Sequence, residues 1–263
     1  MMGIRPPAAA GTFYPAGPRE LKTYIETALS EAAREPLPKE PVKAIIAPHA
    51  GYVYSGAIAA RAFAAAGRER DIRRVVLLGP AHTMAFTGLA APASEGFATP
   101  LGVARVDRTA RDEIAALPQV IIDDAPHARE HSLEVELPFI QTLFPAAPVL
   151  PLVVGEATPA EVAEIIDLLD DGHTLFVVSS DLSHYEPYET AHTHDAMTAR
   201  RIGAFDGAHI GPRDACGARP LAGLLRAARE KHWRPRLLDL RNSGDTAGDR
   251  SRVVGYGAWA FTT

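Results

Sequence analysis

The apolar residues of this chain fall into short continuous runs, and these runs predict the strands of a buried sheet. Because they lack the polar alternation of a half-exposed strand, they are typical of parallel strands covered on both faces. Pro151 lies inside one of them and favours an irregular or edge position there, since proline cannot donate to a strand ladder. The runs are KAIIA (43–47), RRVVLLG (73–79), PVLPLVV (148–154), TLFVVSS (174–180), RLLDLRNSG (236–244) and VVGYGAWAF (253–261).

Between these runs, apolar residues recur at helical spacing and predict helices. One of them has a complete start signal, with Thr158 as N-cap, Pro159 in the first turn and Glu161 at the third helical position. Pro138 predicts a kink or an early break inside another. Residues 97–107 contain a turn-like Pro-Leu-Gly and predict a hairpin or an extended excursion. The predicted helices cover 55–67, 108–117, 131–144, 158–170, 189–205 and 218–230.

Strands that alternate with helices over the whole length predict the α/β class, with a central, mostly parallel sheet flanked by helices. No repeat, low-complexity tract or linker divides the sequence, so we expect residues 1–263 to form a single domain. A chain of 263 residues can bury a sizeable core, and 47% hydrophobic and 22% charged residues are ordinary for a globular protein.

Charge and cysteine content exclude several classes of protein. The net charge is −5 and no run of five basic residues occurs, so binding of nucleic acid is not expected. No apolar stretch is long enough to cross a membrane, and the first residues lack the pattern of a secretory signal. The single cysteine, Cys216, cannot form an intrachain disulfide. Together these features predict a cytoplasmic protein without nucleic-acid or membrane partners.

Ionisable side chains follow three of the predicted strands at the point where each strand ends. His49 and His82 follow the first two runs, and Asp181 follows the fourth, with His184 three residues further on. A single histidine after a strand is usually only a loop residue. The carboxyl ends of parallel strands, however, meet at one edge of a sheet, where ligands bind. The sequence therefore predicts a shared site at this edge.

The residue types at this edge suit a metal ion. Neutral imidazoles bind iron, copper, zinc or nickel, and a carboxylate or thiolate can complete the set of ligands. Cys216 is a candidate thiolate because it precedes a predicted helix, whose N-terminus would lower the pKa of the thiol. A lone cysteine is more often a small buried apolar residue. The spacing is longer than in a zinc finger, so the residues alone do not fix a ligand set.

Other interpretations of these residues stay open. Asp181 would orient an imidazole and His184 would move protons if the two form an acid/base pair. His131 and Glu134 stand at i and i+3 of a predicted helix, as an acid/base element or as a salt link at the helix start. A serine hydrolase is disfavoured because the motif G-x-S-x-G is absent. The histidines expected at the surface are His127, His173, His209 and His232.

Six motifs occur in an order that resembles one protein family. They are RPPAAAGTFYP (5–15), APHAGYVYSG (47–56), LLGPAH (77–82), EHSLEVELPF (130–139), SSDLSHY (179–185) and CGARPL (216–221). This ordered set spans nearly the whole chain and is similar to that of the MEMO family, also called AmmeMemoRadiSam system protein B in bacteria and archaea. The resemblance implies a fold similar to that of the class III extradiol, LigB-type dioxygenases.

The resemblance also implies a metal site made by two histidines and a cysteine. By motif match these ligands are His49, His82 and Cys216. The extradiol dioxygenases instead hold iron with two histidines and a carboxylate. A thiolate in place of that carboxylate argues against ring cleavage of a catechol and favours copper or a redox role. The further site residues of the family match Asp181, His184 and, as a pocket histidine, His131.

We therefore expect a metal-binding protein, with iron (Fe²⁺) as the first choice and copper or zinc as alternatives. The leading function is a redox or oxygenase-like enzyme that acts on an unknown small or modified substrate. The alternative is a non-enzymatic module that binds a peptide or handles metal in the same pocket. A zinc hydrolase is disfavoured because HExxH and HxxEH are absent. The family name further implies a functional link to a radical-SAM protein and an AMMECR1-type protein.

Overall fold

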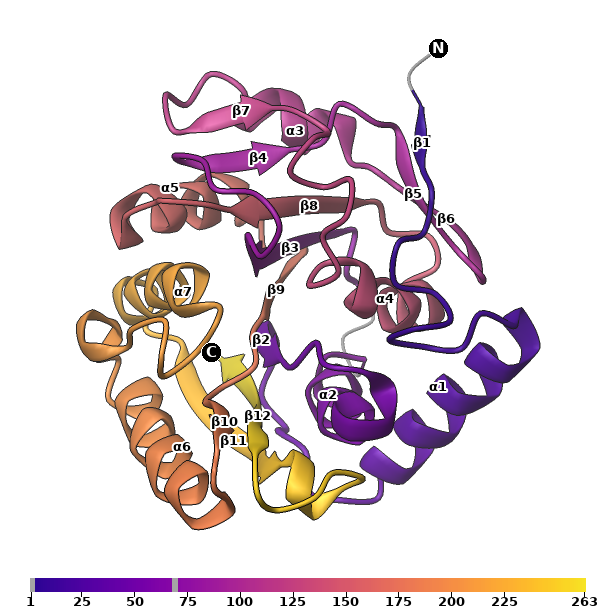
Figure 1. Ribbon diagram of the computed structural model, residues 1–263. Coiled ribbons are helices and arrows are strands. Elements are labelled where there is room, and N and C mark those ends of the chain that lie inside the picture. Colours follow the sequence, from indigo (N-terminus) through magenta and orange to yellow (C-terminus); the bar gives the residue numbers. More distant parts are fainter. Residues whose placement is uncertain (1–2, 68–70) are drawn as a thin grey trace.

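The computed structural model describes residues 3–67 and 71–263, and a nine-stranded sheet runs through its middle (Figure 1). The strands are β1 (Ile4–Arg5), β2 (Val42–Ala47), β3 (Arg74–Pro80), β4 (Leu89–Ala91), β5 (Gly96–Thr99), β6 (Gly102–Arg105), β7 (Val120–Ile122), β8 (Val149–Val154), β9 (Thr174–Ser179), β10 (His184–Glu186), β11 (Arg234–Asn242) and β12 (Val253–Thr262).

The order of strands in the large sheet is β10-β12-β2-β9-β3-β8-β4-β7, and β11 pairs with β12. The four central strands β2, β9, β3 and β8 are parallel to one another. β12 runs antiparallel to β2, and β4 runs antiparallel to β8. The parallel centre confirms the predicted fold class. Because β9 lies between β2 and β3, the carboxyl ends of these three strands stand side by side.

Helices cover both faces of this sheet, with α1, α2 and α4 on one side and α5, α6 and α7 on the other (Figure 1). The helices are α1 (Pro18–Ala32), α2 (Tyr52–Ala66), α3 (Arg108–Ile114), α4 (Leu137–Leu143), α5 (Pro159–Leu169), α6 (Tyr188–Gly203) and α7 (Ala218–Glu230), and short 3₁₀ turns occupy Glu134–Glu136, Gly207–His209 and Ser243–Asp245. Thr158 and Glu161 form the predicted capping box at the start of α5.

Neighbouring residues of each central strand enter opposite halves of the core, as the pleat requires. Ile45 packs in the half that contains Phe63 of α2, whereas Ile46 packs in the half that contains Ile166 of α5. All four of these side chains are fully buried. This two-sided burial explains why the strands appear as continuous apolar runs in the sequence.

Two predicted elements differ locally from expectation, both at prolines. Pro151 lies within the sheet, in register with Leu77 of β3, although β4 pairs only with Val153 and Val154. Pro151 therefore lies outside the part of β8 that pairs with β4. The segment 131–144 begins with a 3₁₀ turn, and α4 starts only at Leu137, which puts Pro138 in a first turn that needs no N–H.

The hairpin expected at 97–107 is confirmed by β5 and β6, which pair antiparallel and join β1 in a separate three-stranded sheet. None of the described helices is both long and apolar enough to cross a membrane.

Candidate metal centre

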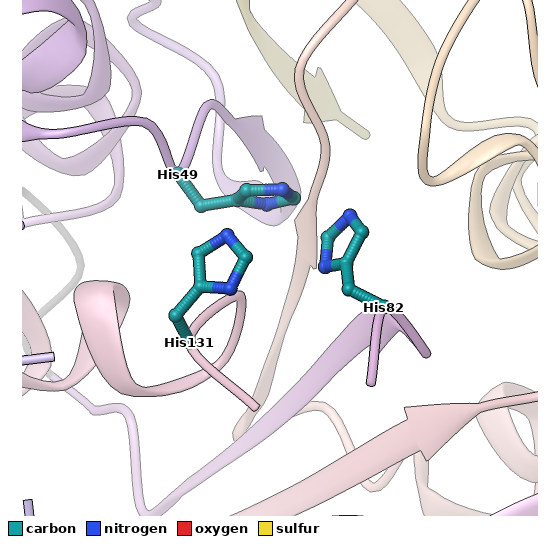
Figure 2. Close-up of side chains that lie close together, drawn as sticks. All are labelled: His49, His82 and His131. Atoms are coloured by element: carbon teal, nitrogen blue, oxygen red, sulfur yellow. The ribbon is translucent and has the colours of Figure 1, made fainter. Parts of the chain in front are cut away.

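Three imidazole rings converge at the carboxyl edge of the parallel strands (Figure 2). His49 follows β2, His82 follows β3, and His131 comes from the loop before the 3₁₀ turn at 134–136. One ligand atom of each ring lies within 4.8 Å of the others. The sequence predicted His49 and His82 as ligands and His131 as a pocket residue. The structure places His131 as close to the other two as they are to each other.

His49 is buried, and its hydrogen bonds leave one ring nitrogen available. Nδ1 lies 2.7 Å from Ser179 Oγ, and this hydroxyl has two acceptors for its hydrogen, the Ser132 carbonyl at 2.7 Å and Glu136 Oε1 at 2.9 Å. The hydroxyl must therefore accept from Nδ1–H, so the lone pair of His49 is on Nε2. Burial, reinforced by the neighbouring His82 and His131, lowers the pKa of His49 well below its ordinary value and keeps the ring neutral.

Glu136 completes the hydrogen bonds of Ser179 behind His49. Its Oε1 lies 2.9 Å from Ser179 Oγ. Burial raises the pKa of Glu136 well above the ordinary value of a carboxyl, against the opposing effect of the Ser179 hydrogen bond. Glu136 Oε1 is thus a second acceptor for the Ser179 hydroxyl, beside the Ser132 carbonyl. The other oxygen, Oε2, is buried without a hydrogen-bond partner, which a neutral acid tolerates better than a carboxylate.

His82 is fixed by a carboxylate. Glu130 accepts the backbone N–H of His82 at 2.7 Å through Oε2 and approaches Nδ1 at 2.9 Å through Oε1. Burial alone would raise the pKa of Glu130, but these bonds outweigh it and lower that pKa to about 2. An ionised Glu130 can only accept, so Nδ1 of His82 carries a proton, and Nε2 is the ring atom that would bind a metal. Carboxylates orient metal-binding histidines in this way.

His131 is held by ring stacking. Its ring lies 4.4 Å from that of Phe13 and 4.8 Å from that of His82, centroid to centroid. The next residue ties the loop to β3, because Ser132 Oγ donates to the Pro80 carbonyl at 3.1 Å. A side chain at Gly79 would block this approach, since its Cβ would lie 2.8 Å from Ser132 Oγ. Burial lowers the pKa of His131.

Cys216 reaches the site from the turn before α7. Its Sγ lies 3.4 Å from His49 Nε2 and accepts the backbone N–H of Asp181 at 3.3 Å. Burial first, and the charge of Asp181 second, raise the pKa of the thiol. The sequence suggested a lowered pKa from the helix N-terminus, but in the absence of a metal the low polarity around the sulfur prevails.

Asp181 and His184, the other two predicted site residues, lie on the segment after β9. Asp181 Oδ1 accepts the backbone N–H of His49 at 2.8 Å. Burial raises the pKa of Asp181 to about 6, although His184 and the His49 N–H oppose the rise. His184 Nδ1 lies 2.8 Å from the carbonyl of Leu182, which fixes its ring as well. A carboxyl that titrates near neutrality suits proton transfer.

A cavity of about 650 Å³ opens over these residues. His49, His82, His131, Asp181 and His184 all line it, and Cys216 lines a smaller cavity of about 140 Å³, which His82 also borders. The larger volume matches that of sites for small organic ligands. All the predicted site residues except Cys216 therefore share one cavity.

The sequence interpretation missed the partners of the histidines. Glu130, Glu136 and the role of Ser179 were hidden inside the motifs EHSLEVELPF and SSDLSHY, and no spacing rule marks them. Glu134 was offered as a partner of His131. It instead accepts from Arg5, from Tyr14 and from the backbone N–H groups of residues 8 and 9. Its role is therefore in folding.

One histidine contradicts its predicted position. His127 was expected at the surface, but its side chain is 1% exposed. Its Nε2 donates to the Ala90 carbonyl at 3.0 Å, and its Nδ1 has no partner. Its own carbonyl accepts from Arg5. The polar residues around His127 in the sequence belong to a loop that folds inward over β4, and sequence polarity could not show this.

The donors fit a transition metal better than a hard cation. The Nε2 atoms of His49 and His82 are the ring atoms that could bind a metal, and a third imidazole and a thiol lie beside them. Calcium and magnesium prefer oxygen ligands, whereas imidazole and thiolate select iron, copper or zinc. A metal bound here would displace the thiol proton.

Comparisons with known proteins agree with the resemblance seen in the motifs. A family described as Memo-like protein matches residues 5–260. A MEMO1 family protein of Aeropyrum pernix is 38% identical, and the alignment covers 98% of this chain and 99% of the relative. One from Methanopyrus kandleri is 36% identical over 98% of both chains. One from Metallosphaera sedula is 33% identical, over 98% of this chain and 99% of the relative.

Among solved structures, an uncharacterized protein from Escherichia coli K12 is similar, with a TM-score of 0.53. The match covers 83% of this chain and 99% of that chain, at 12% sequence identity. At this identity the likeness concerns the fold alone.

Proposed function

Because this chain belongs to the Memo family, we propose that it binds a transition metal at the histidine cluster and acts in redox chemistry on a small organic substrate. Iron is the first choice, and copper or zinc are alternatives. One observation carries the proposal: buried partners hold Nδ1 of both His49 and His82, so that Nε2 of each ring is the atom left for a metal. Such preorganisation is typical of metal ligands.

Cys216 is the third ligand in this proposal, with His131 as the competing candidate. The sulfur lies 3.4 Å from His49 Nε2, and it already accepts the backbone N–H of Asp181. That N–H would stabilise a thiolate once a metal had taken the thiol proton. His131 lies nearer the cavity and stacks on Phe13, which suits contact with substrate. Iron or copper at this position would supply one-electron chemistry.

The chain's own residues would orient the site and move protons. Glu130 fixes the His82 ring, and the buried Ser179 fixes the His49 ring. Asp181, with its pKa raised to about 6 by burial, can hold or release a proton at its carboxyl near neutral pH. The histidines line a cavity of about 650 Å³, a size typical of sites for small organic ligands, so a small molecule fits this site better than an extended peptide.

Metal analysis tests the proposal. The protein is purified without chelator or polyhistidine tag and analysed by plasma mass spectrometry and by absorption spectroscopy. We expect close to one metal per chain, with iron or copper in excess of zinc and a charge-transfer band from thiolate to metal. His49→Ala should lose most of the metal. Cys216→Ser should lose the band, while His131→Ala should keep it.

Two outcomes would overturn the proposal. Equal metal content in wild type and His49→Ala would exclude the site. A colourless zinc protein, unchanged by oxygen or reductant, would exclude the redox role and favour the module that only binds its ligand. A band that survives in Cys216→Ser but disappears in His131→Ala would transfer the third position to His131.

A further inference from the structure

The cavity wall contains a cation that forms no ion pair with a carboxylate among the described residues. This cation is Arg252, an exposed side chain that lines the cavity. In the described part of the chain its guanidinium makes no ion pair, and it lies over the ring of Tyr185, 5.1 Å from the centroid. Other arginines near the sheet behave differently: Arg74 pairs with Asp107, and Arg241 pairs with Asp239. A guanidinium left open beside a cavity is free to bind a ligand.

Tyr185, the partner of Arg252 in this contact, has an unfavourable backbone conformation. Tyr185 has φ of 60°, in the left-handed region that a bulky side chain rarely adopts. The register of β10 against β12 shifts between His184 and Glu186, so Tyr185 is the extra residue of a bulge. Bulges re-aim side chains, and strain of this kind collects at functional sites. Both His184 and Tyr185, on either side of this shift, line the cavity.

The acidic residues that line the cavity have partners other than Arg252. Asp249 also lines the cavity, but its Oδ1 accepts both the backbone N–H and the hydroxyl of Ser251 at 2.6 Å. It therefore caps its own turn. Asp181 accepts the His49 N–H. Apolar and aromatic side chains, among them Phe13, Val254 and Tyr256, line the same cavity.

From this arrangement we infer that the substrate of the proposed function is a small amphipathic anion. Its carboxylate or phosphate pairs with Arg252, its apolar or aromatic body lies against the wall, and its reactive end reaches the histidine cluster. A planar guanidinium matches both kinds of anion through two parallel hydrogen bonds. The inference rests on the proposed function, because it assigns the substrate class of the same site.

Binding of simple probes tests the inference. Phenylacetate and phenyl phosphate are titrated into the metal-loaded protein by calorimetry, with neutral phenylacetamide as the comparison. We expect both anions to bind more tightly than the amide, and added salt to weaken the anions alone. Arg252→Gln should lower anion affinity on the order of tenfold, the usual cost of a hydrogen bond to a charged group. The preference between the two anions then identifies the headgroup.

Arg250→Gln is the matched control. Arg250 lies two residues away, carries the same charge and packs over Tyr188, outside the cavity lining. This variant should bind the anions like wild type. The inference is overturned if neither anion binds at millimolar concentration, if phenylacetamide binds equally well, or if the two variants lose the same affinity.

Metal content, measured on the same samples, separates the two proposals. Arg252→Gln that keeps its metal and its anion affinity refutes the substrate class alone. Wild-type protein that binds no metal but shows anion binding dependent on Arg252 refutes the proposed function alone.

Discussion

Two buried glutamates four residues apart have opposite tasks in this protein. Glu134 belongs to a clamp with Arg5 and Tyr14, which fastens the N-terminal segment to the loop before α4. Glu130 belongs to the histidine cluster, where it holds the backbone N–H and the Nδ1 of His82. Both carboxylates are almost fully buried, at 0% and 1% exposed.

The partners of a buried carboxylate, and not its burial, distinguish these two tasks. Every contact of Glu134 is a donor that stays inside the protein, so the clamp is complete in itself. Glu130 instead fixes a ring whose second nitrogen faces a cavity. The clamp also supports the cluster, because Arg5 donates to the carbonyls of His127 and Glu130 at 2.7 Å.

Breaking the clamp should have the largest effect on stability. Glu134→Gln leaves Arg5 as an uncompensated buried charge, which typically costs about 3–5 kcal/mol of the free energy of unfolding. Urea denaturation followed by circular dichroism measures it. The double variant Arg5→Met/Glu134→Gln should recover part of the loss, because the stranded charge is gone. A loss below about 1 kcal/mol in Glu134→Gln would show that the clamp is not a main support of the fold.

Stability at low pH should report on His127, whose carbonyl accepts from Arg5 of the clamp. Burial lowers the pKa of His127 from 6.5 to about 4, so between these values the unfolded chain binds a proton that the folded chain does not. Stability should therefore fall as the pH falls through this window, by up to about 3 kcal/mol from this residue. His127→Gln, which can still donate to Ala90, should show a shallower loss between pH 7 and pH 4.5. Parallel curves for the two proteins would contradict the assignment.

Changing Glu130 should separate binding from folding. Glu130→Gln removes the charge that orients His82 and should weaken metal binding about 10–100-fold, or about 1.4–2.7 kcal/mol. Its free energy of unfolding should fall less than that of Glu134→Gln. Competition with a coloured chelator measures the affinity. If Glu134→Gln, under conditions where it is folded, weakened metal binding as strongly, the division between the two glutamates would be wrong.

A substitution far from both the clamp and the histidine cluster serves as a control for the link between stability and metal affinity. Thr158→Ala removes the side-chain cap of α5 and should cost about 1 kcal/mol of stability. Because α5 lies away from the cavity, metal affinity should stay unchanged. Weaker metal binding in this variant would mean that affinity simply follows stability, and that the effect of Glu130→Gln is not local.

Local sequence patterns were enough to predict most helices and strands and part of the candidate site. The apolar runs identified β2, β3 and β9 because strands buried on both faces need apolar residues at every position. The capping box of α5 was visible because its hydrogen bonds join residues three apart. His49, His82 and Asp181 were found because parallel strands bring their carboxyl ends to one edge.

The remaining site residues depend on contacts between distant segments. Glu130 meets His82 across 48 positions, and Ser179 meets His49 across 130. The inward fold of the loop at His127 and the bulge at Tyr185 likewise arise from pairing with other parts of the chain. No periodicity in the sequence encodes such pairs.

The sequence by itself determined the α/β class, the strand ends and the residue types that gather there, because these follow from local hydrogen bonding and burial. Only the tertiary structure decided which ring nitrogens are held by buried partners, which glutamate serves the site and which the clamp, and where an arginine without an ion pair among the described residues lines the cavity. Those properties depend on the distance between groups that chain order does not relate, and on a local polarity that exists only once the chain is folded.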